Sequence, residues 1–76
     1  METLRDESVL IAFGKHFKKI RESKNISQEK LALKAGSYQS TIIRIEKGKA
    51  NPKLSTLIAL AKALDIDLKE LTDFKE

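Results

Sequence analysis

The chain has 76 residues, a length that fits one small domain with a single modest core. Hydrophobic residues make up 41% of it, enough for a globular fold and too many for a disordered tail. Cysteine is absent and His16 is the only histidine, which excludes disulfides and the usual metal sites. No apolar run reaches the ~20 residues of a membrane span, and the order of a signal peptide is missing. We therefore expect a cytoplasmic protein.

Charge is unevenly distributed along the chain, whose net charge is +4 at pH 7. Residues 9–62 contain twelve Lys or Arg residues against three Glu residues, whereas residues 1–8 and 63–76 are both net acidic. A basic body between acidic ends favours a polyanionic partner such as nucleic acid. A lysine-rich, solvated surface accounts for the same charge equally well.

The first helix is predicted from a cap at Ser8 to about Lys24. Its apolar residues recur at spacings of three or four and form one stripe: Val9, Phe13, Phe17 and Ile20. Asn25 is expected to end the helix, because asparagine tolerates the left-handed conformation. Residues 1–8 show no clear period and are predicted to be a flexible lead-in to a single domain over residues 9–76.

Two short helices that flank Gly36 are predicted over residues 28–35 and 39–47. Ser27 is a favourable N-cap for the first of them, and Gly36 supplies the positive φ of a tight turn. The positions that would face inward are apolar or small: Leu31, Ala32, Ala35, Ile42 and Ile45. This pattern predicts a helix-turn-helix over about residues 28–47, which commonly lays its second helix in the major groove of DNA.

The rest of the chain predicts a turn and two more helices. Gly48 is a natural end for the preceding helix, and Pro52 discourages helix at the residue before it. A fourth helix is predicted over about residues 54–64, with an apolar stripe wider than one packing face requires.

Asp67 and Glu70 have the spacing of a capping box, which opens a fifth helix to about Asp73. No strand-like alternation, repeat or low-complexity segment is present. The sequence therefore predicts an all-α fold of five helices.

With these residues in place, the chain resembles the phage repressor and Cro-like helix-turn-helix family, often called XRE-type. The resemblance extends from about Phe13 to Leu71. Each matching residue is weak evidence by itself, but the whole set at fixed spacing is specific for the family. They are Phe13, Gly14, Phe17, Ile20, Arg21, Gln28, Ala32, Gly36, Ile42, Glu46, Gly48, Pro52, Leu57, Ala61, Leu64 and Leu71. The resemblance implies a five-helix, lambda-repressor-like domain that binds double-stranded DNA as a homodimer.

The resemblance also implies which residues contact bases, at the start and on the outer face of the third helix. Here they are Tyr38, Gln39, Ser40, Thr41 and Arg44. Gln39 and Arg44 are the best candidates, because Gln pairs with adenine and Arg with guanine through two hydrogen bonds. Ser40 and Thr41 are suited to a base, a phosphate or solvent.

Two positions depart from the family pattern. A small hydroxyl residue normally caps the third helix where this chain has Tyr38, so Ser37 is expected to cap one residue early. Tyr38 is then left to contact a phosphate or to cover the edge of the core. Ile43 replaces a small polar residue, and it is suited to a thymine methyl group or to packing against another helix.

Phosphate contacts are expected at two places. By the resemblance, Gln28 matches a position that contacts a phosphate at the helix N-terminus, beside Ser27, although a solvent-facing amide is the alternative. Polar and basic residues that follow the third helix are expected to flank the DNA backbone: Lys47, Lys49, Asn51 and Lys53. Any single lysine of this group is as consistent with solvation as with DNA contact.

Two further sets have structural roles. Arg21 and Glu46 match a family ion pair that joins the first and third helices. Apolar residues near the C-terminal end exceed what the small core is expected to absorb: Ile58, Ile66, Leu68, Leu71 and Phe74. They predict a two-fold dimer interface, and closure of the monomer's own core is the alternative.

The predicted function is a sequence-specific, DNA-binding transcriptional regulator, such as a repressor, that acts as a homodimer. An antitoxin that also binds its own promoter is the alternative. No nucleophile–base pair is visible, so an enzyme is not expected, and neither is a cofactor, a metal or a small-molecule ligand. The short chain leaves control to dimerisation, as in Cro-like proteins or restriction–modification controllers, an analogy of fold and size.

Overall fold

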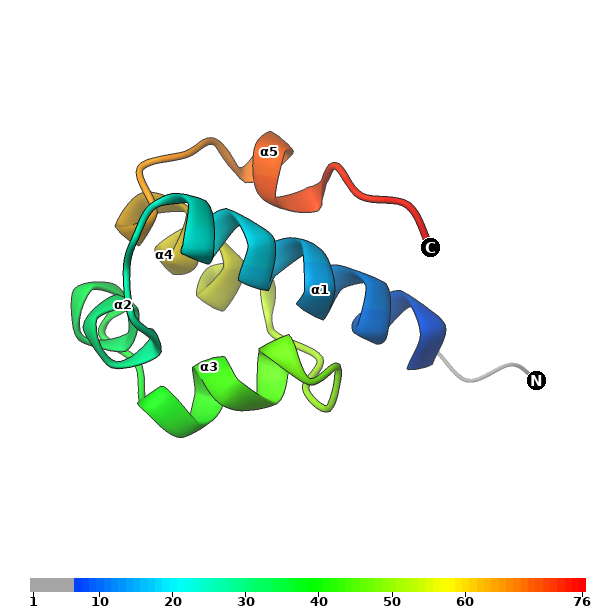
Figure 1. Cartoon of the computed structure of the whole chain (residues 1–76), viewed down its shortest axis with the longest axis horizontal. Coiled ribbons are helices and arrows are strands. Elements are labelled where there is room, and N and C mark those ends of the chain that lie inside the picture. Colours follow the sequence, from blue (N-terminus) through cyan, green and yellow to red (C-terminus); the bar gives the residue numbers. More distant parts are fainter. Residues whose placement is uncertain (1–6) are drawn as a thin grey trace.

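The computed structural model describes residues 7–76, which form five helices and no strand (Figure 1). The helices are α1 (Glu7–Ser23), α2 (Gln28–Ala35), α3 (Gln39–Glu46), α4 (Leu54–Ala63) and α5 (Leu68–Thr72). The all-α prediction is confirmed. The predicted end of α2 coincides with the observed one, and the predicted ends of the other four helices lie one residue beyond those observed. Within residues 7–76, none of the helices has the length and hydropathy that crossing a membrane requires.

The predicted start of the first helix is wrong. Helix α1 begins at Glu7, so Ser8 lies in its first turn and is not its N-cap. The periodic apolar stripe begins only at Val9, and that stripe led the prediction to start the helix too late. The predicted lead-in otherwise lies outside the described residues.

Helices α1 to α4 end in the same backbone pattern. Gly36 has φ 67°, its N–H bonds to the Leu33 carbonyl, and the next N–H, of Ser37, bonds to the Ala32 carbonyl at 2.8 Å. This is a Schellman motif, in which a left-handed residue closes the helix. The left-handed Asn25 and Gly48 were expected at such ends, and both are confirmed. Asp65, with φ 57°, ends α4 in the same way and was not predicted.

Helix starts agree less well with the predictions. Ser27 caps α2 as expected, since its Oγ accepts a hydrogen bond from the Lys30 N–H at 3.1 Å. Asp67 occupies the N-cap of α5 without a side-chain cap bond, so the predicted capping box does not form. Helix α3 also lacks a side-chain cap, so the cap predicted at Ser37 is wrong. Tyr38 is the N-cap of α3, and the backbone N–H of Ser37 closes α2.

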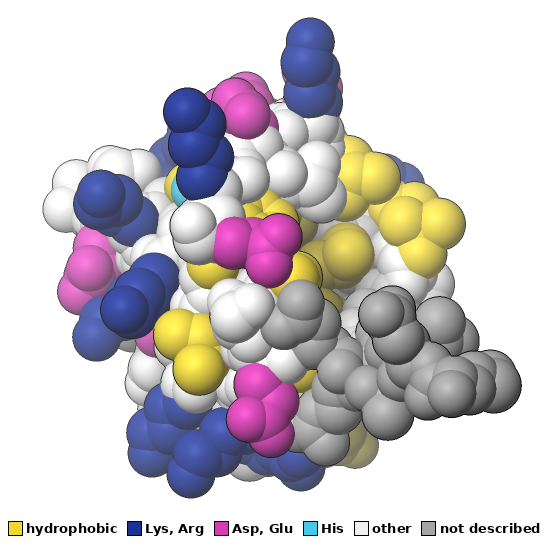
Figure 2. Space-filling model, turned by 90° about the vertical axis from the view of Figure 1, so that its right-hand side faces the viewer, with side chains coloured by type: hydrophobic (Ala, Val, Ile, Leu, Met, Phe, Trp, Pro, Cys, Tyr) yellow, Lys and Arg dark blue, Asp and Glu magenta, His cyan; other side chains and the backbone are white. Residues whose placement is uncertain are grey.

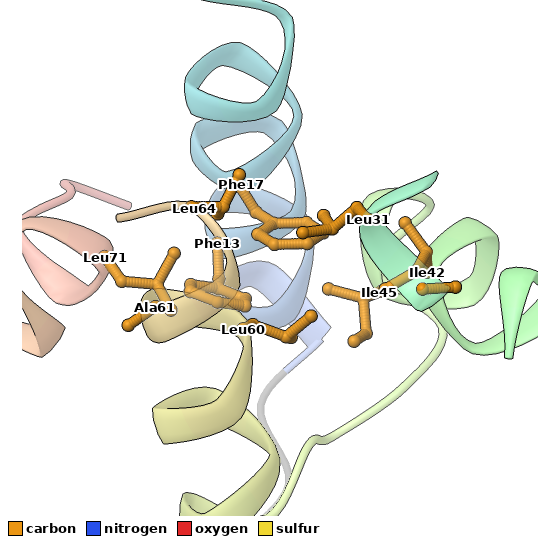
Figure 3. Packing of buried hydrophobic residues seen from close by; sticks show 10 residues of the cluster. Phe13, Phe17, Leu31, Ile42, Ile45, Leu60, Ala61, Leu64 and Leu71 are labelled. Atoms are coloured by element: carbon orange, nitrogen blue, oxygen red, sulfur yellow. The ribbon is translucent and has the colours of Figure 1, made fainter. Parts of the chain in front are cut away.

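The core forms where all five helices converge (Figure 3). Phe13 and Phe17 of α1 stack with ring centroids 6.0 Å apart at its centre. Fully buried side chains from the other four helices surround them: Leu31, Ile42, Ile45, Leu60 and Leu71. In Figure 1, α1 lies between α3 on one side and α5 on the other.

Helix α5 closes the monomer core, which corrects part of the predicted dimer interface. Leu71 is completely buried, so it cannot contact a second copy. The Phe74 ring packs against Phe13 at 5.6 Å, while Ile66 and Leu68 lie partly buried against the same core. Leu71 was assigned to a dimer because the sequence does not show how far α5 folds back onto α1.

His16 of α1 contacts the C-terminal segment. It is half-buried on α1, and its Nε2 donates to the Glu70 carbonyl of α5 at 2.8 Å. The ring also lies 5.9 Å from that of Phe74. His16 therefore helps to attach the C-terminal segment to α1.

Candidate nucleic-acid interface

Helix α3 presents one face to the core and the opposite face to solvent. Ile42 and Ile45 are buried, whereas Gln39, Ser40 and Arg44 are exposed. This division follows from the helical period, because residues three and four apart share a face. The core contact of two isoleucines thus fixes the direction in which the polar residues of α3 point.

The remaining predicted base-contacting residues lie at the margins of that face. Tyr38 is 78% exposed, so it does not cover the edge of the core. Thr41 and Ile43 are both half-buried along the sides of α3. The predicted base-contacting residues thus extend from Tyr38, which precedes α3, along its exposed face to Arg44 in its last turn, with Thr41 at the margin.

A basic loop follows α3. Its predicted phosphate-contacting residues are all exposed: Lys47, Lys49, Asn51 and Lys53. Figure 2 shows Lys and Arg side chains gathered along the lower edge of the molecule, the side on which α3 lies in Figure 1. The exposed polar face and the cations thus occupy the same side of the domain.

Arg44 is tied to this loop. Its Nη2 donates to the Lys49 carbonyl at 3.2 Å, and the Lys49 N–H donates back to the Arg44 carbonyl at 2.9 Å. The second bond belongs to the Schellman end of α3, but the side-chain bond has no signal in the sequence. Together they hold the Arg44 side chain over the loop.

The predicted ion pair between α1 and α3 is present. Arg21 Nε donates to Glu46 Oε2 at 2.5 Å and Nη2 donates to Oε1 at 3.2 Å. The hydrogen bond to Glu46 is the main cause that raises the pKa of the Arg21 guanidinium, so this group stays charged. Side-chain exposure is 11% for Arg21 and 4% for Glu46, so the pair is largely shielded from water.

Gln28 joins this ion pair, which the sequence did not indicate. Its Nε2 donates to Glu46 Oε1 at 3.0 Å, and its side chain is half-buried at the start of α2. Ser27 beside it is exposed, and its Oγ accepts the hydrogen bond that caps α2.

Within residues 7–76, no group of His, Asp or Glu side chains is arranged to hold a metal ion.

Comparison with known proteins agrees with this geometry. The model of the HTH_3 helix-turn-helix family matches residues 17–71. Control protein C.BamHI of Bacillus amyloliquefaciens is 38% identical over 68 residues, which cover 88% of this chain and 84% of that protein. The immunity repressor of Bacillus phage phi105 is 40% identical over 58 residues, which cover 76% of this chain and 40% of the repressor.

Solved structures show the same relationship. The restriction-modification controller protein C.AhdI from Aeromonas hydrophila superposes with a TM-score of 0.82 and 38% identity. The match covers 84% of this chain and 97% of that one. The chain therefore belongs to the HTH_3 (XRE-type) helix-turn-helix family of DNA-binding transcriptional regulators.

Proposed function

We propose that this regulator binds specific double-stranded DNA sequences as a homodimer, with α3 in the major groove. The observation that carries the proposal is the exposed polar face of α3, backed by buried Ile42 and Ile45 and bordered by a basic loop. A helix held rigidly by its apolar side is suited to reading base edges with its polar side.

Gln39 and Arg44 are the main base-reading residues in this proposal, and Tyr38, Ser40 and Thr41 contribute around them. Arg44 has five N–H donors, and one bond to the Lys49 carbonyl leaves the others for guanine O6 and N7. The hydrogen bond to Lys49 already restricts the Arg44 side chain, so less conformational entropy is lost when this side chain contacts a base.

Two groups of residues that flank α3 are assigned to contacts with DNA phosphates, which do not depend on the base sequence. Ser27 and Gln28 lie at the start of α2, where free backbone N–H groups favour a phosphate. The basic loop supplies the other group: Lys47, Lys49, Asn51 and Lys53. Contacts of this kind release counterions, so affinity falls steeply as salt is added.

The dimer interface proposed here centres on α4. Ile58 is 39% exposed, and Leu54, one turn earlier on the same face, is 62% exposed. The partly buried Ile66, Leu68 and Phe74 add to this interface, whereas Leu71 does not. A two-fold dimer would place the two copies of α3 about 34–36 Å apart, one turn of DNA.

Selection of preferred duplexes from a random pool tests this function. The expected result is an inverted repeat whose half-site centres are separated by about one helical turn, roughly 10 base pairs. Enrichment of a single unrepeated half-site would contradict the dimer. Equal binding of all duplexes at every salt concentration would contradict sequence-specific recognition.

The similarity to C.AhdI over most of both chains favours control of restriction–modification genes over the antitoxin alternative. The prediction is that the selected sequence occurs upstream of a neighbouring restriction or modification gene. Its occurrence only before a toxin gene, together with a stable complex between this chain and that toxin, would favour the antitoxin function instead.

A further inference from the structure

The side chain of Gln28 has a defined orientation because of the group it contacts. Its Nε2 lies 3.0 Å from Glu46 Oε1, across the boundary between α2 and α3. A carboxylate accepts hydrogen bonds and donates none, so the amide nitrogen of Gln28, and not its oxygen, faces Glu46. The second N–H of Nε2 is therefore the donor that remains for a ligand.

Glu46 is itself a fixed anchor. Arg21 donates to both of its carboxylate oxygens, and Arg21 Nη1 also donates to the Ile26 carbonyl at 2.8 Å. With a side-chain exposure of 4%, Glu46 has little space in which to change rotamer. Gln28 is thus bound to a carboxylate that Arg21 of α1 holds in place. Arg21 is itself bonded to the turn that precedes α2.

We propose that Glu46 is a positioning residue that holds Gln28 ready to contact a DNA phosphate. The inference rests on the proposed function, because it takes the phosphate contact of Gln28 from there. A donor that is already oriented loses less conformational freedom on binding than a free glutamine side chain does. Arg21 offsets the negative charge of Glu46, which would otherwise repel the phosphate.

Nuclear magnetic resonance of the free protein tests the positioning itself. The chain contains two glutamines, and the exposed Gln39 serves as an internal reference for a free side-chain amide. We expect the Gln28 side-chain amide signals to be displaced from those of Gln39, and the N–H that is bonded to Glu46 to be protected from exchange with water. Coincidence of the two sets of signals in the unsubstituted protein would overturn the inference.

Glu46→Gln removes the anchor while keeping the shape of the side chain. Arg21 retains the remaining oxygen, so the new amide nitrogen faces Gln28 and cannot accept from it. Gln28 can contact that nitrogen only by turning its own oxygen inward, which displaces its donor N–H groups. The Gln28 amide signals should then move to the free position. Glu29→Gln is the charge-matched control, because it removes an exposed carboxylate from the first turn of α2 and leaves the acceptor of Gln28 in place.

The expected consequence is that DNA binding weakens when Gln28 is no longer oriented. It is tested by the affinity of each variant for a short, labelled duplex of mixed sequence at low salt. The affinity is measured below the melting temperature of every variant. Gln28→Ala and Glu46→Gln should each weaken binding about two- to tenfold, and the double variant should bind no more weakly than Gln28→Ala alone. Glu29→Gln should bind no more weakly than the unsubstituted protein.

The outcomes separate this inference from the proposed function. Additive losses in the double variant, or equal losses for Glu46→Gln and Glu29→Gln, would overturn the positioning role. Failure of the unsubstituted protein to bind any duplex would overturn the proposed function and the phosphate contact with it. In that case the amide signals still report independently whether Glu46 holds Gln28.

Discussion

Gly14 of α1 lies directly against the backbone of Ile45 in α3. A Cβ atom at Gly14 would lie 2.5 Å from the Ile45 carbonyl oxygen and 2.8 Å from that of Glu46. Both obstacles are backbone atoms of a helix, so they cannot rotate aside as a flexible side chain would. The close crossing of α1 and α3 therefore requires a glycine at this position.

Gly14→Ala is predicted to push α3 away from α1. We expect the free energy of unfolding to fall by about 1–3 kcal/mol, the usual cost of overpacking. For a domain of this size that lowers the melting temperature by about 4–8 °C per kcal/mol. Thermal melts followed by circular dichroism measure it, with the exposed Lys15→Ala as a control that should melt close to the unsubstituted protein. An unchanged melting temperature for Gly14→Ala would contradict the crossing.

Glu46→Ala is predicted to weaken folding more than base preference. It leaves the Arg21 guanidinium shielded and without its carboxylate, a change that costs about 3–5 kcal/mol. Urea unfolding measures the loss, and competition between duplexes measures the preference of the remaining folded protein. A changed preferred sequence at unchanged stability would show that Glu46 acts in recognition and not in folding.

Arg44→Ala and Lys49→Ala are predicted to have different effects on DNA binding. Loss of a bidentate base contact should relax the preference at one base position, by about 1–3 kcal/mol. Loss of a phosphate contact should weaken all duplexes alike and reduce the salt slope by about 1. Titrations of selected and scrambled duplexes at several salt concentrations measure both effects.

Lys75→Ala is the charge-matched control for these two variants. Lys75 is exposed in the segment that follows α5, and Figure 1 shows this segment on the other side of α1 from α3. It should leave both the base preference and the salt slope unchanged. The assignment of Arg44 is wrong if its variant retains the full preference.

Ile58→Glu is predicted to shift the protein from dimer to monomer, because it places a charge in the proposed α4 interface. Leu33→Glu is the matched control, since Leu33 lies on α2 and is 75% exposed. Sedimentation equilibrium of both variants measures the association. Dimers of equal strength in the two variants would exclude α4 as the interface.

Ser27→Ala is predicted to destabilise the domain by about 1 kcal/mol, because it removes the side-chain cap of α2. Ser23→Ala is its control, since the Ser23 Oγ donates back to the Ile20 carbonyl and caps no helix start. Urea unfolding of the two variants gives the difference in stability. Equal stabilities would mean that the Ser27 cap contributes nothing measurable.

Local sequence determined most of the secondary structure. The left-handed residues Asn25, Gly36 and Gly48 and the N-cap Ser27 act within a few neighbouring residues, so the sequence alone predicts them. The period of the third helix likewise predicted that Ile42 and Ile45 face inward while Gln39, Ser40 and Arg44 face outward. The sequence alone therefore predicts which face of α3 is buried and which is exposed.

Tertiary structure decided which of those residues meet. Whether Leu71 closes the monomer core or joins a second copy depends on how α5 docks, and that depends on the whole core. The bond between Gln28 and Glu46 joins residues from different helices, which only the packing of α2 and α3 brings within reach. Helix periods and caps are short-range and leave a local pattern, whereas such contacts depend on interhelical distances that no single segment of the chain specifies.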